Sequence, residues 1–173
     1  KHLFIPTSQT FAPGGNVTIP GNFTNNGNFT ASTYTVTFSG TSQTVKGSTT
    51  FNNLTLTAGQ TVTFTSGTTQ TISGTLTCTG SSGNLITIAA SAASAATLSK
   101  SGGTVSCNYM SISYSTATGG ATWNATSSTN GGNNSGWNFL GLVPPRRGEG
   151  GDSGEKAKSA IFELVHFKGY TND

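Results

Sequence analysis

Few side chains in this sequence are suited to acid–base, nucleophilic or metal chemistry. All five acidic residues fall in the last 31 positions, and residues 1–142 contain no aspartate or glutamate. Paired-carboxylate catalysis and strong sites for Ca²⁺ or Mg²⁺ both require anionic oxygens. A catalytic triad would also lack its base, because the two histidines, His2 and His166, lie near the ends of the chain. We therefore predict no enzymatic activity, no catalytic residue and no cofactor.

The two cysteines are the remaining candidates for chemistry. Cys78 and Cys107 each lie in a segment where apolar and polar residues alternate. On neighbouring rungs of one sheet they would form a disulfide, and otherwise they are two buried thiols that pack as small hydrophobic side chains. The sequence leaves both alternatives open. Neither cysteine has companion ligands nearby, so we expect no metal site.

The elements that position these cysteines are short β-strands. From Asn16 onward, apolar residues alternate with threonine, for example in segments 17–19, 34–38 and 86–88. This period of two is typical of strands with one buried face. Threonine and serine make up 54 of the 173 residues and only 8% of residues are charged, which argues against a helical bundle. The sequence predicts an ordered all-β domain.

A longer repeat favours a β-solenoid. Segment 36–47 (VTFSGTSQTVKG) resembles segment 62–74 (VTFTSGTTQTISG), which has one insertion before its first glycine. Short strands with a period in the twenties, separated by Gly, Asn and Ser, indicate coils that stack and bury a ladder of apolar side chains. The distance from Cys78 to Cys107 is close to one such coil. A β-sandwich is the alternative, because it also uses short strands with frequent turns.

The second half of the chain also resembles a known type of module. Segments 101–115, 116–125 and 130–139, with their Gly-Gly-Ala-Thr-Trp and Gly-Asn-Asn-Ser-Gly-Trp pieces, are similar to the closing segment of right-handed parallel β-helix modules. Such modules occur in secreted bacterial surface proteins and phage tail-associated proteins. The resemblance covers roughly residues 50–139, implies a right-handed parallel β-helix in an extracellular or virion setting, and transfers no active site. At the open end of the stack, we predict that Trp123 and Trp137 act as capping residues.

The sequence divides into four segments. Residues 1–15, apolar and punctuated by prolines, are predicted to be an N-terminal cap or docking segment, and residues 16–141 the Thr/Ser/Gly-rich solenoid. Residues 142–159 form a charged Pro/Gly-rich linker that starts with Pro144 and Pro145. Residues 160–173 hold an extra strand, which is apolar on both alternating sets and cannot be stable alone. The residues of this assembly strand are Ile161, Phe162, Leu164, Val165 and Phe167.

These patterns predict a non-enzymatic, extracellular structural subunit of a fibre, pilus-like filament or surface appendage. The C-terminal strand would add to a neighbouring subunit while the linker spans the gap, and head-to-tail contacts of this kind produce a homopolymer. Three scattered lysines in residues 1–142 form no basic patch, so nucleic acid is not an expected partner. No run reaches the roughly 18 apolar residues of a membrane helix, so membrane insertion is not expected.

Two alternative functions remain open. The first is a carbohydrate-binding adhesin or phage tail-fibre module, in which Tyr34, Tyr109 and Tyr114 would stack on a cell-surface glycan. The second is an ice-binding solenoid, which the Thr-x-Thr arrays suggest. We expect several of these arrays to fall at different phases of the coil, which weighs against one flat ice-binding face. The arrays are Thr35/Thr37, Thr55/Thr57, Thr61/Thr63/Thr65 and Thr75/Thr77/Thr79.

Overall fold

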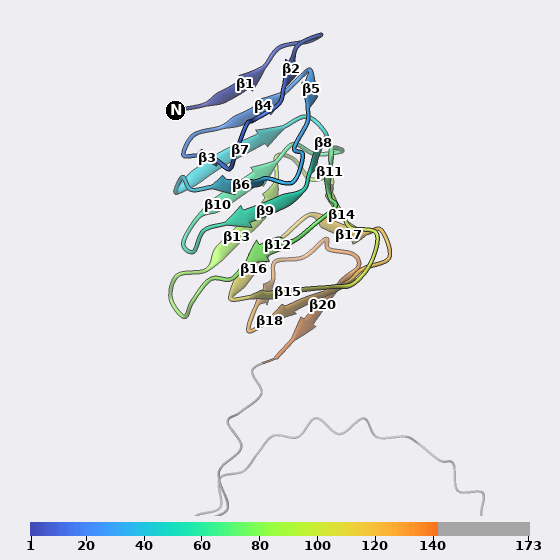
Figure 1. The fold of residues 1–173 in the computed structure, drawn as a ribbon. Helices are drawn as coiled ribbons and strands as arrows, with labels where there is room; N and C mark the ends of the chain where they lie inside the picture. Colours follow the sequence, from blue (N-terminus) through green and yellow to red (C-terminus); the bar gives the residue numbers. More distant parts are fainter. Residues whose placement is uncertain (142–173) are drawn as a thin grey trace, which may run out of the picture. The chain divides into compact units, whose positions relative to one another are not determined.

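The computed structural model describes residues 1–141, and the predicted linker and C-terminal strand lie outside these residues. The described part is all-β and contains no helix; its strands form a parallel β-solenoid of about seven turns (Figure 1). Every pairing between its named strands is parallel, which excludes the β-sandwich, whose sheets are antiparallel. The predicted solenoid is confirmed.

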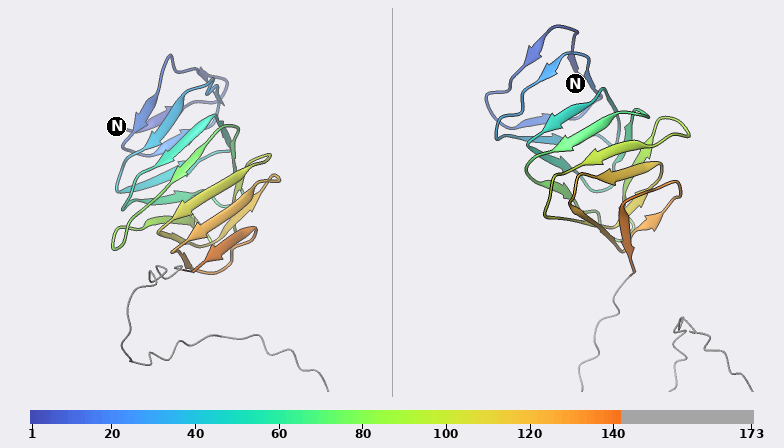
Figure 2. Two further views of the ribbon diagram at one scale, coloured as in Figure 1. Left: turned by 60° about the horizontal axis from the view of Figure 1, so that its bottom comes forward. Right: turned by 90° about the vertical axis from the view of Figure 1, so that its right-hand side faces the viewer.

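Successive strands of each coil lie on three faces of the stack (Figure 2). Face 1 is one seven-stranded sheet. Its strands, in order along the stack, are β1 (Leu3–Ile5), β4 (Phe23–Asn25), β7 (Ser42–Lys46), β10 (Thr61–Phe64), β13 (Ile86–Ala90), β16 (Met110–Ile112) and β19 (Thr129–Asn130).

Faces 2 and 3 are each made of two sheets. Face 2 contains the pair β2 (Thr10–Phe11) and β5 (Asn28–Phe29), followed by β8 (Thr49–Phe51), β11 (Thr69–Ile72), β14 (Ala96–Ser99) and β17 (Ser115–Thr118). Face 3 contains β3 (Val17–Ile19), β6 (Thr35–Phe38), β9 (Asn53–Leu56) and β12 (Leu76–Cys78), followed by β15 (Thr104–Asn108), β18 (Thr122–Thr126) and β20 (Trp137–Leu140). A parallel bridge between Thr79 and Asn108 connects the two sheets of face 3.

The sequence repeat that favoured the solenoid does not correspond to the structural repeat. Val36 lies in β6 on face 3, where it pairs with Val17 and Leu54, whereas Val62 lies in β10 on face 1. The spacing of paired residues along face 1 also varies: Ser111 and Thr129 pair across a short coil, and Thr61 and Thr87 pair across a longer one. The turns absorb this variation, so the strands stay in register although the coils differ in length.

Residues 1–15 belong to the first coil of the solenoid. β1 pairs with β4 and β2 pairs with β5, both in parallel register. The stack therefore begins at Leu3, earlier than the boundary at Asn16 that the sequence suggested, because the first two strands are too short for the alternation of apolar and polar residues to be visible.

The interior of the first three coils is a cluster of phenylalanines. Phe23 is fully buried, and its ring centroid lies 5.8, 6.0 and 5.7 Å from those of Phe29, Phe38 and Phe51. These rings come from all three faces, so the cluster joins the faces as well as the rungs. Aromatic pairs at this spacing contribute about 0.5–1.5 kcal/mol beyond the area that they bury.

The corners of the coils bring backbone segments close together. Gly47 has a φ of +84°, and a Cβ at this position would lie 2.0 Å from the carbonyl oxygen of Asn25 in the coil before it. Only glycine fits this approach without displacing the backbone. In the next coil Gln70, which is fully buried, donates from Nε2 to the Gly47 carbonyl oxygen at 2.9 Å. This hydrogen bond joins the corner at Gly47 to the coil that follows it.

Candidate interaction surfaces

Residues 1–141 hold few groups for acid–base or metal chemistry. They contain three lysines and no carboxylate side chain, and no group of three or more His, Cys, Asp or Glu side chains in this part of the chain could hold a metal ion. One of the lysines, Lys100, donates from Nζ to the Gly74 carbonyl oxygen. The same residues include no helix that is long and apolar enough to span a membrane. The surfaces that remain as candidates are the outward faces and the two ends of the stack.

Face 2 carries two outward columns of hydroxyl side chains. The parallel registers of β8, β11, β14 and β17 align four residues in the first column and three in the second, to which a bridge between Thr116 and Ser135 adds a fourth. The two columns are Thr50–Thr71–Ser99–Thr118 and Thr69–Thr97–Thr116–Ser135. Neighbouring strands lie about 4.8 Å apart, and alternate residues of one strand lie about 6.6 Å apart. The face is therefore a regular, uncharged grid of hydroxyls on stiff, mostly β-branched side chains.

Three of the four threonine arrays also share a face. Thr37 pairs with Thr55, and Thr55 pairs with Thr77, all on the outward side of face 3. The expectation that such arrays fall at different phases of the coil is wrong for these three, because the turns absorb the differences in coil length. The fourth array starts in β10 on face 1, where Thr61 pairs with Ser42 and Thr87.

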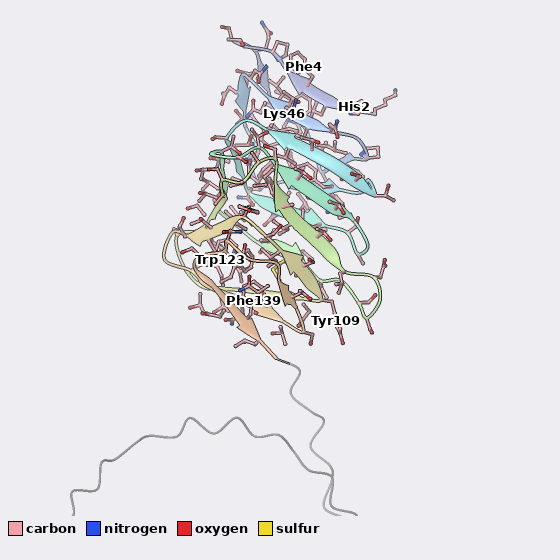
Figure 3. All side chains as sticks on the ribbon, turned by 180° about the vertical axis from the view of Figure 1, so that it is seen from behind. His2, Phe4, Lys46, Tyr109, Trp123 and Phe139 are labelled. Carbon is pink, nitrogen blue, oxygen red and sulfur yellow. A yellow bond between two sulfur atoms is a disulfide. The ribbon has the colours of Figure 1, made fainter. Side chains whose placement is uncertain are left out.

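The N-terminal end of the stack exposes Phe4, whose side chain is 58% accessible (Figure 3). All three prolines of the described residues lie in this first coil: Pro6 follows β1, Pro13 lies two residues after β2, and Pro20 follows β3. A proline removes a backbone donor, and natural sheets place prolines on edge strands to prevent unwanted pairing.

The C-terminal end of the described stack is formed by β20 on face 3. Leu140 is 46% exposed, and it and Phe4 are the two large hydrophobic side chains exposed in residues 1–141. The sequence placed Phe4 in a predicted cap or docking segment but singled out neither residue, because alternation alone does not separate an outward apolar residue on an end rung from an inward one. Both end rungs therefore offer an apolar side chain beside a strand edge.

The two predicted capping tryptophans lie on adjacent rungs near this end (Figure 3 labels Trp123). Trp137 in β20 pairs with Trp123 in β18, and their ring centroids are 5.2 Å apart in an edge-to-face arrangement. Trp123 is 1% exposed and donates from Nε1 to the Thr118 carbonyl oxygen at 3.1 Å. Trp137 donates from Nε1 to Ser115 Oγ at 3.1 Å. Trp137 therefore lies on the last described rung and covers Trp123, which is an interior residue.

Cys78 and Cys107 form a disulfide, and their Cα atoms are 4.9 Å apart. Cys78 ends β12 and Cys107 lies in β15, on neighbouring rungs of face 3. Of the two alternatives that the sequence left open, the structure has the bonded pair. This bond joins the two sheets of face 3 at the point where the ladder between them is interrupted.

Tyr34, Tyr109 and Tyr114 are each half-buried, so none offers a fully open ring to a sugar. The linker residues Pro144 and Pro145 and the assembly strand lie outside the described residues. The assembly strand contains Ile161, Phe162, Leu164, Val165 and Phe167.

The fold and its surfaces define the protein as a β-solenoid with uncharged hydroxyl faces and an internal disulfide. Comparisons with family models, curated proteins and solved structures find no match to the chain. The case for a function therefore depends on the geometry of the faces and the ends.

Proposed function

We propose that this protein is a non-enzymatic structural subunit of an extracellular fibre, pilus-like filament or surface appendage, and that subunits join by addition of a terminal strand. The observation that carries the proposal is the pair of end rungs. In residues 1–141, β1 and β20 each pair with a strand on one side only, and each contains an exposed apolar residue, Phe4 or Leu140. An unpaired edge of this kind accepts a further strand through main-chain hydrogen bonds.

Two further features support this function. The disulfide between Cys78 and Cys107 is of the kind that persists in oxidising, extracellular settings. The sides of the solenoid carry polar, uncharged columns of threonine and serine, which leave the ends as the apolar sites for assembly. A strand donated by one copy to the next is a heterologous contact, and repeated contacts of this kind extend into a filament when they do not close into a ring.

Deleting residues 155–173 is expected to abolish assembly and leave a folded monomer. The deletion removes the apolar assembly strand and keeps every described strand. The full chain and the truncated chain are compared at equal micromolar concentration by sedimentation velocity and negative-stain electron microscopy. Circular dichroism serves as the control for folding.

Regular filaments from the full chain and monomers from the truncated chain support the proposal. Assembly that survives the deletion would contradict it, as would a full chain that stays monomeric across the concentration range. The second result would assign residues 160–173 to a cap on their own domain.

A carbohydrate-binding or ice-binding module is the second candidate, and the hydroxyl grid of face 2 favours it. Flat, regular and uncharged surfaces suit partners that are themselves regular and uncharged, such as polysaccharides or ice, because many identical weak contacts add up. Here the affinity would lie in the side of the solenoid and not in its ends.

Thr97→Lys tests this candidate, because Thr97 lies within one column and pairs with Thr69 and Thr116. A glycan array and an ice recrystallisation assay should show binding by the wild-type chain and its loss in the variant. Stability should change by no more than about 0.5 kcal/mol, as for most surface substitutions. The matched control is Thr87→Lys on face 1. Equal binding by both variants, or none by the wild type, rejects face 2 as a binding surface.

A further inference from the structure

We propose that the strand donated by one copy pairs with the outer edge of β20 in the next copy, in the register that places Phe162 over Trp137 and Val165 beside Leu140. This inference rests on the proposed function for the source of the strand. The C-terminal end of the solenoid would be the acceptor, and residues 161–167 would pair with β20 in one register. The two end rungs differ in a way that decides between them.

The N-terminal edge is poorly suited to accept a strand. Leu3 N donates to the Asn22 carbonyl oxygen and Asn26 N donates to the Ile5 carbonyl oxygen, both at 2.9 Å, so Leu3 and Ile5 face β4. The alternate position after β1, which faces the open edge, is Pro6 and has no N–H. The same holds for β3. Ser39 N donates to the Ile19 carbonyl oxygen at 3.1 Å, so the backbone of Ile19 points toward β6 and that of the next residue, Pro20, points toward the open edge. At both edges, a proline therefore removes the N–H group that a further strand would need for its hydrogen bonds.

The C-terminal edge of the described residues has no such interruption. Ser127 N donates to the Leu140 carbonyl oxygen at 3.0 Å, so the backbone N–H and C=O of Leu140 point toward β18. The backbone N–H and C=O groups of the alternate residues Trp137, Phe139 and Gly141 then point to the outer edge of β20, where, within residues 1–141, they are free to pair with a further strand. These edge-facing positions are enough for a short parallel rung like those within the solenoid, many of which are three or four residues long.

The side chains of the two strands match in one register. Pairing Trp137 with Phe162 places Phe162 and Leu164 over the inward Trp137 and Phe139. On the outward side the same register places Glu163 beside Asn138 and Val165 beside the exposed Leu140. The exposed leucine would thereby gain an apolar neighbour.

A slip by one residue in either direction removes this match. A slip one way would place Glu163 over Phe139, and a slip the other way would place it over Trp137. Either slip moves the carboxylate from the outward face to the apolar interior, where it would lie unpaired. The position of Glu163 therefore specifies which side of the donated strand faces inward, and the pairing of Val165 with the exposed Leu140 selects this register among those of the same phase.

The reach of the linker does not decide between the two ends. A fully extended segment with the length of residues 142–159 would span at most about 60 Å, whereas about seven rungs rise only about 30 Å. The chemistry of the edges is therefore the deciding factor. Paired residues on face 3 are separated in sequence by a short distance from Trp123 to Trp137 and by a long one from Thr79 to Asn108. The distance in sequence from Trp137 to Phe162 lies between these two. A strand from the same copy would thus fit the same edge, and the experiment must separate the two sources.

The test is disulfide cross-linking of the full chain carrying Leu140→Cys and Val165→Cys. Adjacent rungs of this solenoid accommodate a disulfide, as the 4.9 Å Cα separation of Cys78 and Cys107 shows. After mild oxidation, non-reducing electrophoresis should show a ladder of cross-linked oligomers, several-fold stronger than in two matched variants. One control pairs Leu140→Cys with Leu164→Cys, on opposite faces of the proposed rung. The other pairs Phe4→Cys with Val165→Cys and tests the N-terminal edge. Circular dichroism verifies that each variant is folded.

Each result has a distinct meaning. A ladder from the Leu140/Val165 variant alone supports both the acceptor edge and the donated strand. A cross-linked monomer from that variant overturns donation, and with it the proposed function. A ladder from the Phe4/Val165 variant alone overturns this inference and leaves the proposed function intact. No cross-link in any variant overturns both.

Discussion

Replacing Phe23 with alanine is expected to lower the free energy of unfolding of the N-terminal coils by about 3–5 kcal/mol. Phe23 is fully buried, and its ring lies 5.7–6.0 Å from the rings of Phe29, Phe38 and Phe51. The cavity cannot collapse easily, because β4 is hydrogen-bonded to β1 on one side and β7 on the other. Whole domains are stable by only about 5–15 kcal/mol, so this loss is a large fraction of the total.

The two tryptophans allow this loss to be located within the stack. Trp123 and Trp137 lie in β18 and β20, close to the opposite end of the solenoid from Phe23. In a stacked repeat each coil contacts only its neighbours, so a defect in the first coils need not destabilise the last ones. In urea, the midpoint measured by far-UV circular dichroism should fall, whereas the midpoint measured by tryptophan fluorescence should move less.

Phe23→Leu is the matched control, since it keeps most of the side-chain volume and should cost less than about 1.5 kcal/mol. If Phe23→Ala left the circular dichroism midpoint unchanged, the phenylalanine cluster would not support the N-terminal coils. Equal shifts in both probes would instead indicate that all the coils unfold as one unit.

The sequence was sufficient to predict the fold class, although the repeat used for that prediction was assigned to the wrong structural unit. Alternation of apolar residues with threonine is a local property, and it correctly indicated the strands. The similarity between segments 36–47 and 62–74 reflects a strand, turn and strand motif that occurs at two different faces, since Val36 lies on face 3 and Val62 on face 1. A motif can recur at any corner of a three-sided coil, so its offset in sequence is not the length of a coil.

The surfaces were less predictable than the interior. Which threonines share a face depends on the register between coils, and that register is set by hydrogen bonds between strands that are a whole coil apart in the sequence. The same limit applies to Phe4 and Leu140, whose exposure depends on which rungs come first and last among the described residues. One local signal for the N-terminal end was present: the three prolines at positions 6, 13 and 20, one close after each strand of the first coil.

The disulfide could be anticipated only as one of two alternatives. The separation between the two cysteines exceeds the face 1 spacing from Thr61 to Thr87, so sequence distance alone did not place them on neighbouring rungs. They meet because the chain between them includes a longer excursion: the antiparallel bridges Ser81–Asn84 and Ala92–Ser94 mark two protruding turns. Extra residues in those turns lengthen the coil without changing the register of β12 and β15.

Removing this disulfide, with Cys78→Ala and Cys107→Ala together, is expected to lower the free energy of unfolding by about 3–4 kcal/mol. The bond links residues with a sequence separation of 29, and the loss of chain entropy in the unfolded state accounts for a value of this size. Alanine is preferred to serine because the two positions are 1% and 0% exposed, and a buried hydroxyl without a partner would add its own penalty. Chemical denaturation with and without a reductant measures the change.

The position of the bond predicts how unfolding will change as well as by how much. β12 and β15 belong to different sheets, and the Thr79–Asn108 bridge connects them, so face 3 is weakest between these two rungs. Without the disulfide, the N-terminal and C-terminal coils should be less strongly coupled, and the difference between the midpoints from circular dichroism and tryptophan fluorescence should be larger than in the wild-type chain. Thr77→Ala, one position before Cys78 on the outward side, is the control and should cost no more than about 0.5 kcal/mol. Coincident midpoints in the double alanine variant, at the wild-type value, would mean that the inward packing of face 3 holds this joint without the bond.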